Sequence, residues 1–156
     1  MTPAQLSALK ADIQASFAAE YAAGQYNIIA EAYNALAAPD FYVWKTSLAA
    51  KEMHESGYVW SELDALTQAK YNQLSLMLSQ GVVNPSKANV RQGFLDIFAG
   101  AGFATTRTAL VALAKRKATV AEKLFATGTG SEGSPAELSF EGSVSSQTIM
   151  EAMSNG

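Results

Sequence analysis

The stretch "ATGTGSEGSP" at residues 126–135 places three glycines in the G-x-G-x-x-G spacing of a dinucleotide-binding turn. In such a site the glycines follow a β-strand and open an α-helix, whose N-terminus faces the pyrophosphate of the cofactor. Here a helical pattern ends near Phe125, before the glycines, and a short alternating pattern near Leu138 follows them. Because this order is reversed, we expect no nucleotide site and no cofactor. We interpret residues 126–135 as a flexible Gly/Ser-rich hinge.

Side chains that could catalyse a reaction or bind a metal are few. The chain has no cysteine and a single histidine, His54, which excludes cysteine-ligated metals and a pair of histidine ligands. Glu52 and Glu55 lie close to His54 in the sequence, but no pattern brings the three side chains together on a ligand. A Ser-His-Asp triad would have to use the same histidine, and no serine lies in a nucleophile motif. We therefore expect no catalytic residue and no metal site, and an enzyme is the function class that the sequence favours least.

The net charge of −3 conceals an uneven distribution of charged residues. Residues 1–86 carry 4 basic and 8 acidic side chains, residues 87–123 carry 7 basic and 2 acidic ones, and residues 124–156 carry 4 acidic and no basic ones. A basic block therefore lies between two acidic blocks. This pattern suits docking between neighbouring copies of the chain, and it gives a weaker indication of contact with nucleic acid.

The basic block contains a run of three cations, Lys115, Arg116 and Lys117. The run follows a helical pattern, and cations at a helix C-terminus complement the helix dipole. Contact with phosphates or with an acidic partner surface is the alternative that the sequence leaves open. We therefore treat the three residues as candidates for a partner interface.

An aromatic segment, "FYVWKTS" at residues 41–47, interrupts the helical patterns. Its aromatic and β-branched residues predict a short strand, with Phe41 and Val43 on one face and Tyr42 and Trp44 on the other. Both faces are apolar. The segment is therefore either buried on both sides within its own chain or placed at an interface, which makes its three aromatic residues interface candidates.

The remaining patterns predict a mostly α fold: a small helical bundle with a short aromatic extended segment and a C-terminal arm containing a short strand. A capping box at Thr2 predicts a helix start. A second box, Thr119-x-x-Glu122, leaves two readings open: the helix that begins at Thr105 or Thr106 continues through it, or a separate turn starts at Thr119. Apolar residues at three- and four-residue spacing predict about six helices, the longest from Ser61 to the glycine at position 81. Strands are expected only near residues 41–46 and 137–141.

These elements suggest three parts: a helical body at residues 1–125, the hinge at 126–135 and a C-terminal arm at 136–156. In the arm, Leu138 and Phe140 alternate with polar residues and are further interface candidates. Alone, the arm has too little apolar area to offset about 1–2 kcal/mol of backbone entropy per ordered residue. We therefore expect the arm to become ordered on a neighbouring chain.

Three stretches of the chain resemble one protein family. "FYVWKTS" (41–47), "NVRQGFLDIFAGAG" (89–102) and "KRKATVAEKLFATGTGSEGSPAELSFEG" (115–142) resemble small virion proteins encoded in the structural gene modules of tailed bacteriophages and prophages. The resemblance extends over residues 6–153, and its most specific part is the block 115–142. It brings no catalytic motif to this chain. It implies a structural part of the virion, made in the host cytoplasm.

Size and helical content are similar to those of head–tail adaptors, the neck or connector proteins that form a ring under the portal, although this step is an analogy of architecture. The expected partners are other copies in a homo-oligomeric ring, virion proteins such as portal or tail components, and incidentally the packaged DNA. A tail or decoration protein is the alternative within the same class. A small DNA-binding packaging or regulatory protein, acting through Arg107 and residues 115–117, comes from a different class. We expect no membrane partner, because no stretch approaches the roughly 18 apolar residues of a membrane span.

Overall fold

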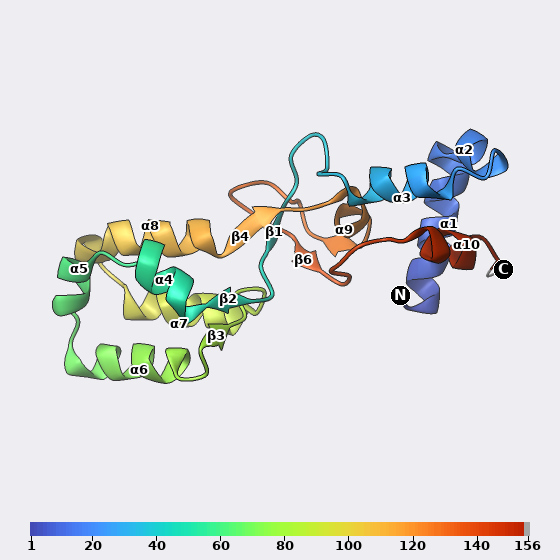
Figure 1. Cartoon of the computed structure of the whole chain (residues 1–156). Helices are drawn as coiled ribbons and strands as arrows, with labels where there is room; N and C mark the ends of the chain where they lie inside the picture. Colours follow the sequence, from blue (N-terminus) through green and yellow to red (C-terminus); the bar gives the residue numbers. More distant parts are fainter. Residues whose placement is uncertain (155–156) are drawn as a thin grey trace. The chain divides into compact units, whose positions relative to one another are not determined.

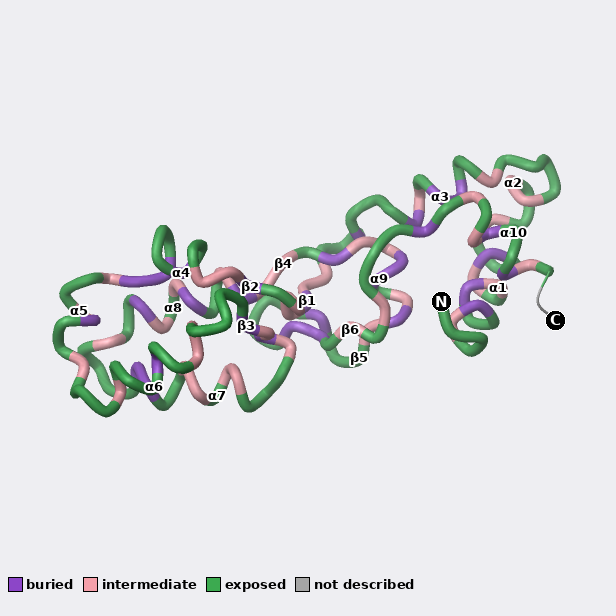
Figure 2. Tube along the Cα trace, turned by 60° about the horizontal axis from the view of Figure 1, so that its bottom comes forward, coloured by how far each residue is buried: buried purple, intermediate pink, exposed green. Residues whose placement is uncertain are grey.

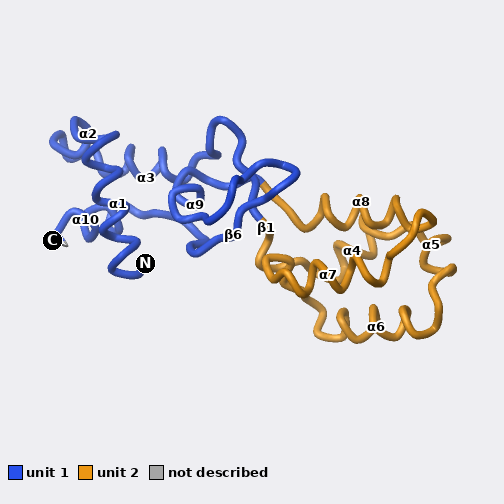
Figure 3. The backbone as a smooth tube through the Cα atoms, turned by 180° about the vertical axis from the view of Figure 1, so that it is seen from behind, with its two compact units in different colours: residues 1–43, 117–156 blue, residues 44–116 orange. Residues whose placement is uncertain are grey.

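A computed structural model describes residues 1–154 of the chain. The fold is mostly α, as the sequence predicts, with 10 α-helices and a few short strands in small sheets (Figure 1). The described residues divide into two compact units, shown in Figure 3. Unit 1 combines residues 1–43 and 117–156, of which 155–156 lie outside the described residues, and unit 2 contains residues 44–116.

The chain crosses between the units within two strands, β1 (Tyr42–Trp44) and β4 (Lys115–Lys117). These two strands pair with each other in a two-stranded sheet. The backbone N–H of Lys45 donates to the Ala114 carbonyl, and that of Ala118 donates to the Phe41 carbonyl, at 2.8 Å each. The aromatic segment is therefore extended, as the sequence predicts.

Unit 1 is formed by both ends of the chain. Its remaining elements are α1 (Pro3–Ser16), α2 (Ala18–Ala22), α3 (Tyr26–Asn34), α9 (Val120–Leu124), β5 (Ala126–Thr127), β6 (Glu137–Leu138) and α10 (Ser146–Ser154). The predicted capping boxes at Thr2 and Thr119 are both present and start α1 and α9. Local sequence signals therefore position these two helices correctly.

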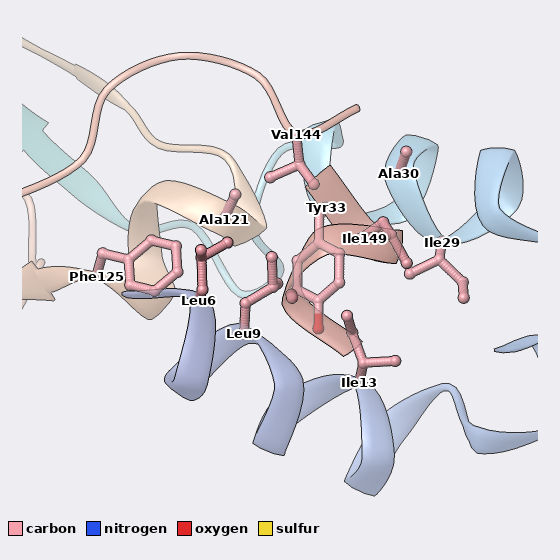
Figure 4. Packing of buried hydrophobic residues seen from close by; sticks show 11 residues of the cluster. Leu6, Leu9, Ile13, Ile29, Ala30, Tyr33, Ala121, Phe125, Val144 and Ile149 are labelled. Atoms are coloured by element: carbon pink, nitrogen blue, oxygen red, sulfur yellow. The ribbon is translucent and has the colours of Figure 1, made fainter. Parts of the chain in front are cut away.

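The core of unit 1 lies where α1, α3 and α10 meet (Figure 4). Figure 2 marks the buried positions along these helices. Tyr33 is fully buried, and its hydroxyl donates to the Asp12 carboxylate at 2.6 Å. Burial raises the pKa of Tyr33 well above its usual range, and the hydrogen bond to Asp12 raises it further. The apolar residues buried in this core are Leu6, Leu9, Ile13, Ile29, Ala30, Tyr33, Ala121, Phe125, Val144, Ile149 and Ala152.

The C-terminal segment belongs to this core, which corrects the interpretation of residues 136–156 as an arm independent of a body at 1–125. Helix α10 packs against α1 and α3, and Ile149 and Ala152 are fully buried there. The Asn34 side-chain amide also clamps Val144: it donates to the Val144 carbonyl and accepts from the Val144 N–H, at 2.8 Å each. The helices of unit 1 supply the apolar contacts that the segment lacks when it is considered alone.

The glycine-rich stretch 126–135 is a folded hairpin in this structure, where we expected a hinge. The stretch begins with β5, which pairs antiparallel with β6 just after it, with Ala126 opposite Leu138. Gly130 has a φ of 65°, and a Cβ at this position would overlap the ring of Phe41. Its carbonyl accepts a hydrogen bond of 2.7 Å from the Tyr42 N–H. The glycine therefore permits a close approach between two segments.

Unit 2 is a helical unit with one small sheet. Its elements are β2 (Leu48–Ala49), α4 (Ala50–Ser56), α5 (Trp60–Asp64), α6 (Gln68–Leu78), β3 (Val82–Val83), α7 (Ala88–Ile97), the 3-10 helix η1 (Ala101–Phe103) and α8 (Ala104–Leu113). Strands β2 and β3 pair antiparallel. The fully or almost fully buried residues at its centre are Leu48, Met53, Tyr58, Leu63, Leu74, Val83, Ile97, Phe98 and Leu110. Burial alone raises the pKa of Tyr58 above its usual range.

Two predictions, one about unit 2 and one about the strands of both units, are wrong. The helix expected from Ser61 to Gly81 is broken into α5 and α6, because Thr67 adopts an extended backbone (φ −65°, ψ 153°) and caps α6. Strands are also not confined to 41–46 and 137–141: β2, β3, β4 and β5 lie elsewhere. β2, β3 and β5 have only two residues each, too few to produce an alternating pattern in the sequence.

Candidate interaction surfaces

The aromatic segment 41–44 packs largely within its own chain. Val43 is fully buried with Ala118 and Ala136. Phe41 is half-buried, and the Lys123 ammonium lies 5.7 Å from the centre of its ring. Tyr42 is also half-buried and is held by backbone hydrogen bonds to Gly130 and Ala136 at 2.7 and 2.9 Å. The roles of Phe41 and Tyr42 in an interface therefore stay predictions.

Trp44, the last residue of β1, contacts residues of unit 2. Its ring packs under the guanidinium of Arg91, which lies 4.6 Å from the ring centre. It also lines a hollow in unit 2, described below. The half-buried Trp44 side chain is thus the aromatic residue of this segment that borders a surface depression.

The basic run lies in β4 and starts two residues after the last residue of α8, so it does not form the last turn of that helix. The Lys117 ammonium is 2.8 Å from a carboxylate oxygen of Asp40. This hydrogen bond, together with the charge of Asp40, raises the pKa of Lys117. Lys115 and Arg116 are half-buried. The run is therefore held in a strand, and its positive charge is partly compensated at Lys117.

The two apolar candidates in the C-terminal segment, Leu138 and Phe140, also contact unit 1. Leu138 lies in β6 and packs beside the cluster of Val43, Ala118 and Ala136. The Phe140 ring meets that of Phe125 edge-on, with the ring centres 5.5 Å apart. These contacts give both side chains a position within their own unit, where the sequence interpretation assigned them to a neighbouring copy.

The hairpin that contains the glycine pattern gives no helix N-terminus for a phosphate. The loop is followed by strand β6, and the next helix, α10, starts at Ser146. Thr129 and Ser131 stabilise the loop through hydrogen bonds to Ser134, at 3.0 and 3.1 Å. A dinucleotide turn requires a helix directly after the glycines, so the geometry is unsuited to that use.

His54 has the aromatic neighbours Tyr58 and Trp60. Its ring stacks on Trp60 at 6.0 Å. Glu52 faces the N-terminus of α4, where it accepts a hydrogen bond from the Ala49 N–H at 3.0 Å and pairs with Lys45 at 3.4 Å. The pKa of Glu52 is lowered mainly by the hydrogen bond from Ala49 and, to a smaller extent, by Lys45. Within residues 1–154, no group of three potential metal-binding side chains comes together.

A second hollow, near His54 in unit 2, is lined by leucine side chains together with aromatic and polar ones. Trp60 and Tyr71 are both half or more exposed at its edge. The Glu62 carboxylate, on the same helix as Trp60, accepts from the Thr106 N–H at 2.9 Å. Hydrogen bonding to Thr106 lowers the pKa of Glu62. Thr106 is fully buried and its hydroxyl accepts from the Val59 N–H at 3.1 Å, so this group connects the starts of α5 and α8.

An apolar groove is bordered by α7 and α8 of unit 2. We call it the α7–α8 groove. It has a volume of about 170 Å³. Leu48 and Leu110 are buried at its base, while Leu95 and Val111 are 41% and 39% exposed at its edge. Its full lining is Trp44, Leu48, Pro85, Arg91, Phe94, Leu95, Arg107, Leu110, Val111 and Ala114.

Sequence reasoning found only part of this groove. Trp44 was a candidate, but Leu95 and Val111 were not, because they lie outside the apolar stripes that the helical spacing of α7 and α8 picks out. The sequence does contain an indication of these two residues, because each helix carries an apolar residue beside its apolar stripe. Leu95 directly follows Phe94, and Val111 directly follows Leu110. Such adjacent pairs place apolar side chains on two sides of a helix.

Searches against protein-family models, curated proteins and solved structures find no match to this chain. In the described part of the chain, no helix combines the length and hydrophobicity needed to cross a bilayer.

Proposed function

We propose that the protein is a structural subunit of a tailed-phage virion, most specifically a head–tail adaptor that assembles as a ring on the portal. In this proposal the chain is made in the host cytoplasm, has no catalytic role, and associates with copies of itself and with portal or tail proteins. The resemblance of residues 6–153 to small virion proteins supports the class. The opposite net charges of the two units support the self-association.

The observation that carries the proposal is the opposite charge of the two compact units. Unit 1 has 3 basic and 9 acidic side chains, a net charge of −6, whereas unit 2 has 8 basic and 5 acidic ones, a net charge of +3. Complementary potentials of this kind steer association and fix the register of two partners. An acidic unit of one copy can therefore dock on the basic unit of the next.

Such a contact joins two different surfaces of the same molecule, and it is heterologous when the same two copies do not also form the reciprocal contact. After the first contact, one copy keeps an unused basic surface and the other copy keeps an unused acidic surface. Heterologous contacts generate closed rings when the rotation between copies closes, and open filaments when it does not. A symmetric dimer can also pair unlike units, with each acidic unit on the basic unit of the partner, but it then uses both surfaces of both copies and leaves none for a third copy. Charge segregation between the units is therefore compatible with the ring architecture of an adaptor, and the oligomeric state distinguishes the ring from such a dimer.

This proposal predicts self-association that depends strongly on salt. At an ionic strength of about 0.01 M, where the Debye length is about 30 Å, the sedimentation coefficient is expected to rise with protein concentration beyond the value for a dimer. At about 1 M, where the Debye length is about 3 Å, the protein is expected to sediment as a monomer. Sedimentation velocity at several protein concentrations measures both.

Association that is independent of salt, or that stops at a symmetric dimer, would contradict the proposed contact. A gel shift of generic DNA that disappears as salt rises would favour the DNA-binding alternative. One cation of that alternative is already paired within the chain: the Lys117 ammonium lies 2.8 Å from a carboxylate oxygen of Asp40.

A further inference from the structure

We infer that the α7–α8 groove binds helix α3 of a second copy, with Ile28 of that copy in the groove and Glu31 facing the arginines that border it. The inference rests on the proposed function, since it names the surfaces through which copies of the chain would meet. Of the residues at its centre, Ile28, Glu31 and Leu95 were not candidates from the sequence.

The groove has the properties of a docking surface for an apolar side chain. Its lining is almost entirely apolar, with Phe94, Leu110 and Ala114 among the contributing residues. Leu95 and Val111 keep about two fifths of their surface in contact with solvent. Concave apolar surface of this kind gains free energy when a partner removes it from water. A volume of about 170 Å³ is suited to one branched apolar side chain and not to a large ligand.

Two arginines give the groove a positive border. Arg91 is positioned by its Nη1, which donates to the carbonyls of Pro85 and Ser86 at 2.7 Å each, and by the ring of Trp44 beneath it. Arg107 is positioned by the carbonyls of Phe98 and Gly100. The carbonyl acceptors of Arg107 are neutral, so they orient its guanidinium group without cancelling its charge. The complementary partner is an apolar side chain with a carboxylate nearby.

Helix α3 of unit 1 presents this combination to solvent. Ile28 is 44% exposed, and Glu31, three residues later, is exposed as well. Residues three apart on a helix lie on the same face with their Cβ atoms about 5–6 Å apart. Glu31 has no ion pair among the described residues. α3 also belongs to the acidic unit, so its wider surroundings carry the charge opposite to that of unit 2.

The other exposed apolar residue on a helix of unit 1, Met150 in α10, lacks this combination. Met150 is also 44% exposed, but the residues three and four positions away are Ser146, Gln147, Met153 and Ser154, none of which carries a charge. An amphipathic helix that places one apolar anchor in a groove and one carboxylate beside it follows a common mode of peptide recognition. The geometry therefore selects α3.

Disulfide trapping tests the inference directly, because the chain has no cysteine of its own. Two full-length variants, Ile28→Cys and Leu95→Cys, are mixed in equal amounts under mild oxidation, one of them carrying a tag that shifts its mass. A mixed disulfide can form only between two molecules. We expect about tenfold more mixed dimer than in the matched control mixture of Ile28→Cys with Leu76→Cys, since docking raises the effective concentration of the paired positions.

Leu76 is a suitable control because it is 75% exposed in the same unit and lines neither hollow. Equal amounts of mixed dimer in the two mixtures would overturn the assignment of α3 to the groove. If the wild-type protein still associates in a salt-dependent manner, that result leaves the proposed function in place and moves the contact elsewhere. A wild-type protein that remains monomeric at every salt concentration would instead count against the proposed function.

Discussion

Replacing Ile149 with alanine is expected to lower the free energy of unfolding of unit 1 by about 3 kcal/mol, within the range of 2–5 kcal/mol for large-to-small changes in a core. Ile149 is fully buried among α1, α3 and α10, where Figure 4 shows it beside Tyr33. The substitution removes apolar contacts and leaves a cavity. Urea unfolding followed by circular dichroism measures the loss. Hydrogen exchange in α1 is expected to become about 100-fold faster.

The adjacent residue provides a matched control. Met150 is 44% exposed, so Met150→Ala is expected to change stability by no more than about 0.5 kcal/mol. If the two variants lose stability equally little, α10 does not hold unit 1 together in solution. That result would restore the interpretation of residues 136–156 as an arm that waits for a neighbouring chain.

Replacing Gly130 with valine is expected to destabilise unit 1 by about 3 kcal/mol or more. The glycine has a φ of 65°, and this left-handed conformation costs an L-residue about 1–2 kcal/mol. Any Cβ at this position would also overlap the Phe41 ring, so the hairpin or the aromatic segment would have to move. Overpacking of this kind adds about 1–3 kcal/mol. The midpoint of urea unfolding measures the combined effect.

Gly133, three residues later in the same loop, is the control for this prediction. It has no positive φ, and a Cβ there would meet nothing within 4 Å. Gly133→Ala is therefore expected to be neutral or slightly stabilising, because it restricts the unfolded chain. Similar tolerance at both glycines would contradict the packed hairpin and support a mobile hinge.

Local signals in the sequence predicted the parts of the fold that depend on local chemistry. The capping boxes at Thr2 and Thr119 lie at the starts of α1 and α9. Each such cap uses residues within one turn of helix, so spacing alone reveals it. The mostly α fold class follows from the same signals.

The division of the chain into units could not be predicted in this way. Unit 1 joins residues 1–43 to residues after 116, and its core depends on contacts such as those between Asn34 and Val144. Contacts between residues this far apart in the sequence leave no periodic pattern. The isolated C-terminal segment was judged by its own apolar content, which omits the surfaces that α1 and α3 provide. The same limitation made the loop containing Gly130 resemble a hinge.

The candidate surfaces show a similar division between local and tertiary information. Trp44 was recognisable as an apolar residue in an extended segment, but the groove beside it depends on how α7, α8 and the turn containing Pro85 pack together. The charge blocks were visible in the sequence. Their assignment to two opposite units required the fold, because residue 117 is where the chain returns to unit 1.

The central claim is that copies of this chain join through unlike units, and electron microscopy of the assembled protein tests it most directly. The chain would be produced together with the proteins encoded beside its gene, and the resulting complex imaged. The account predicts a closed ring in which unit 1 of each copy lies on unit 2 of the next, with α3 at the α7–α8 groove. A complex in which like units meet across a two-fold axis, or a chain that stays monomeric beside those proteins, would contradict it.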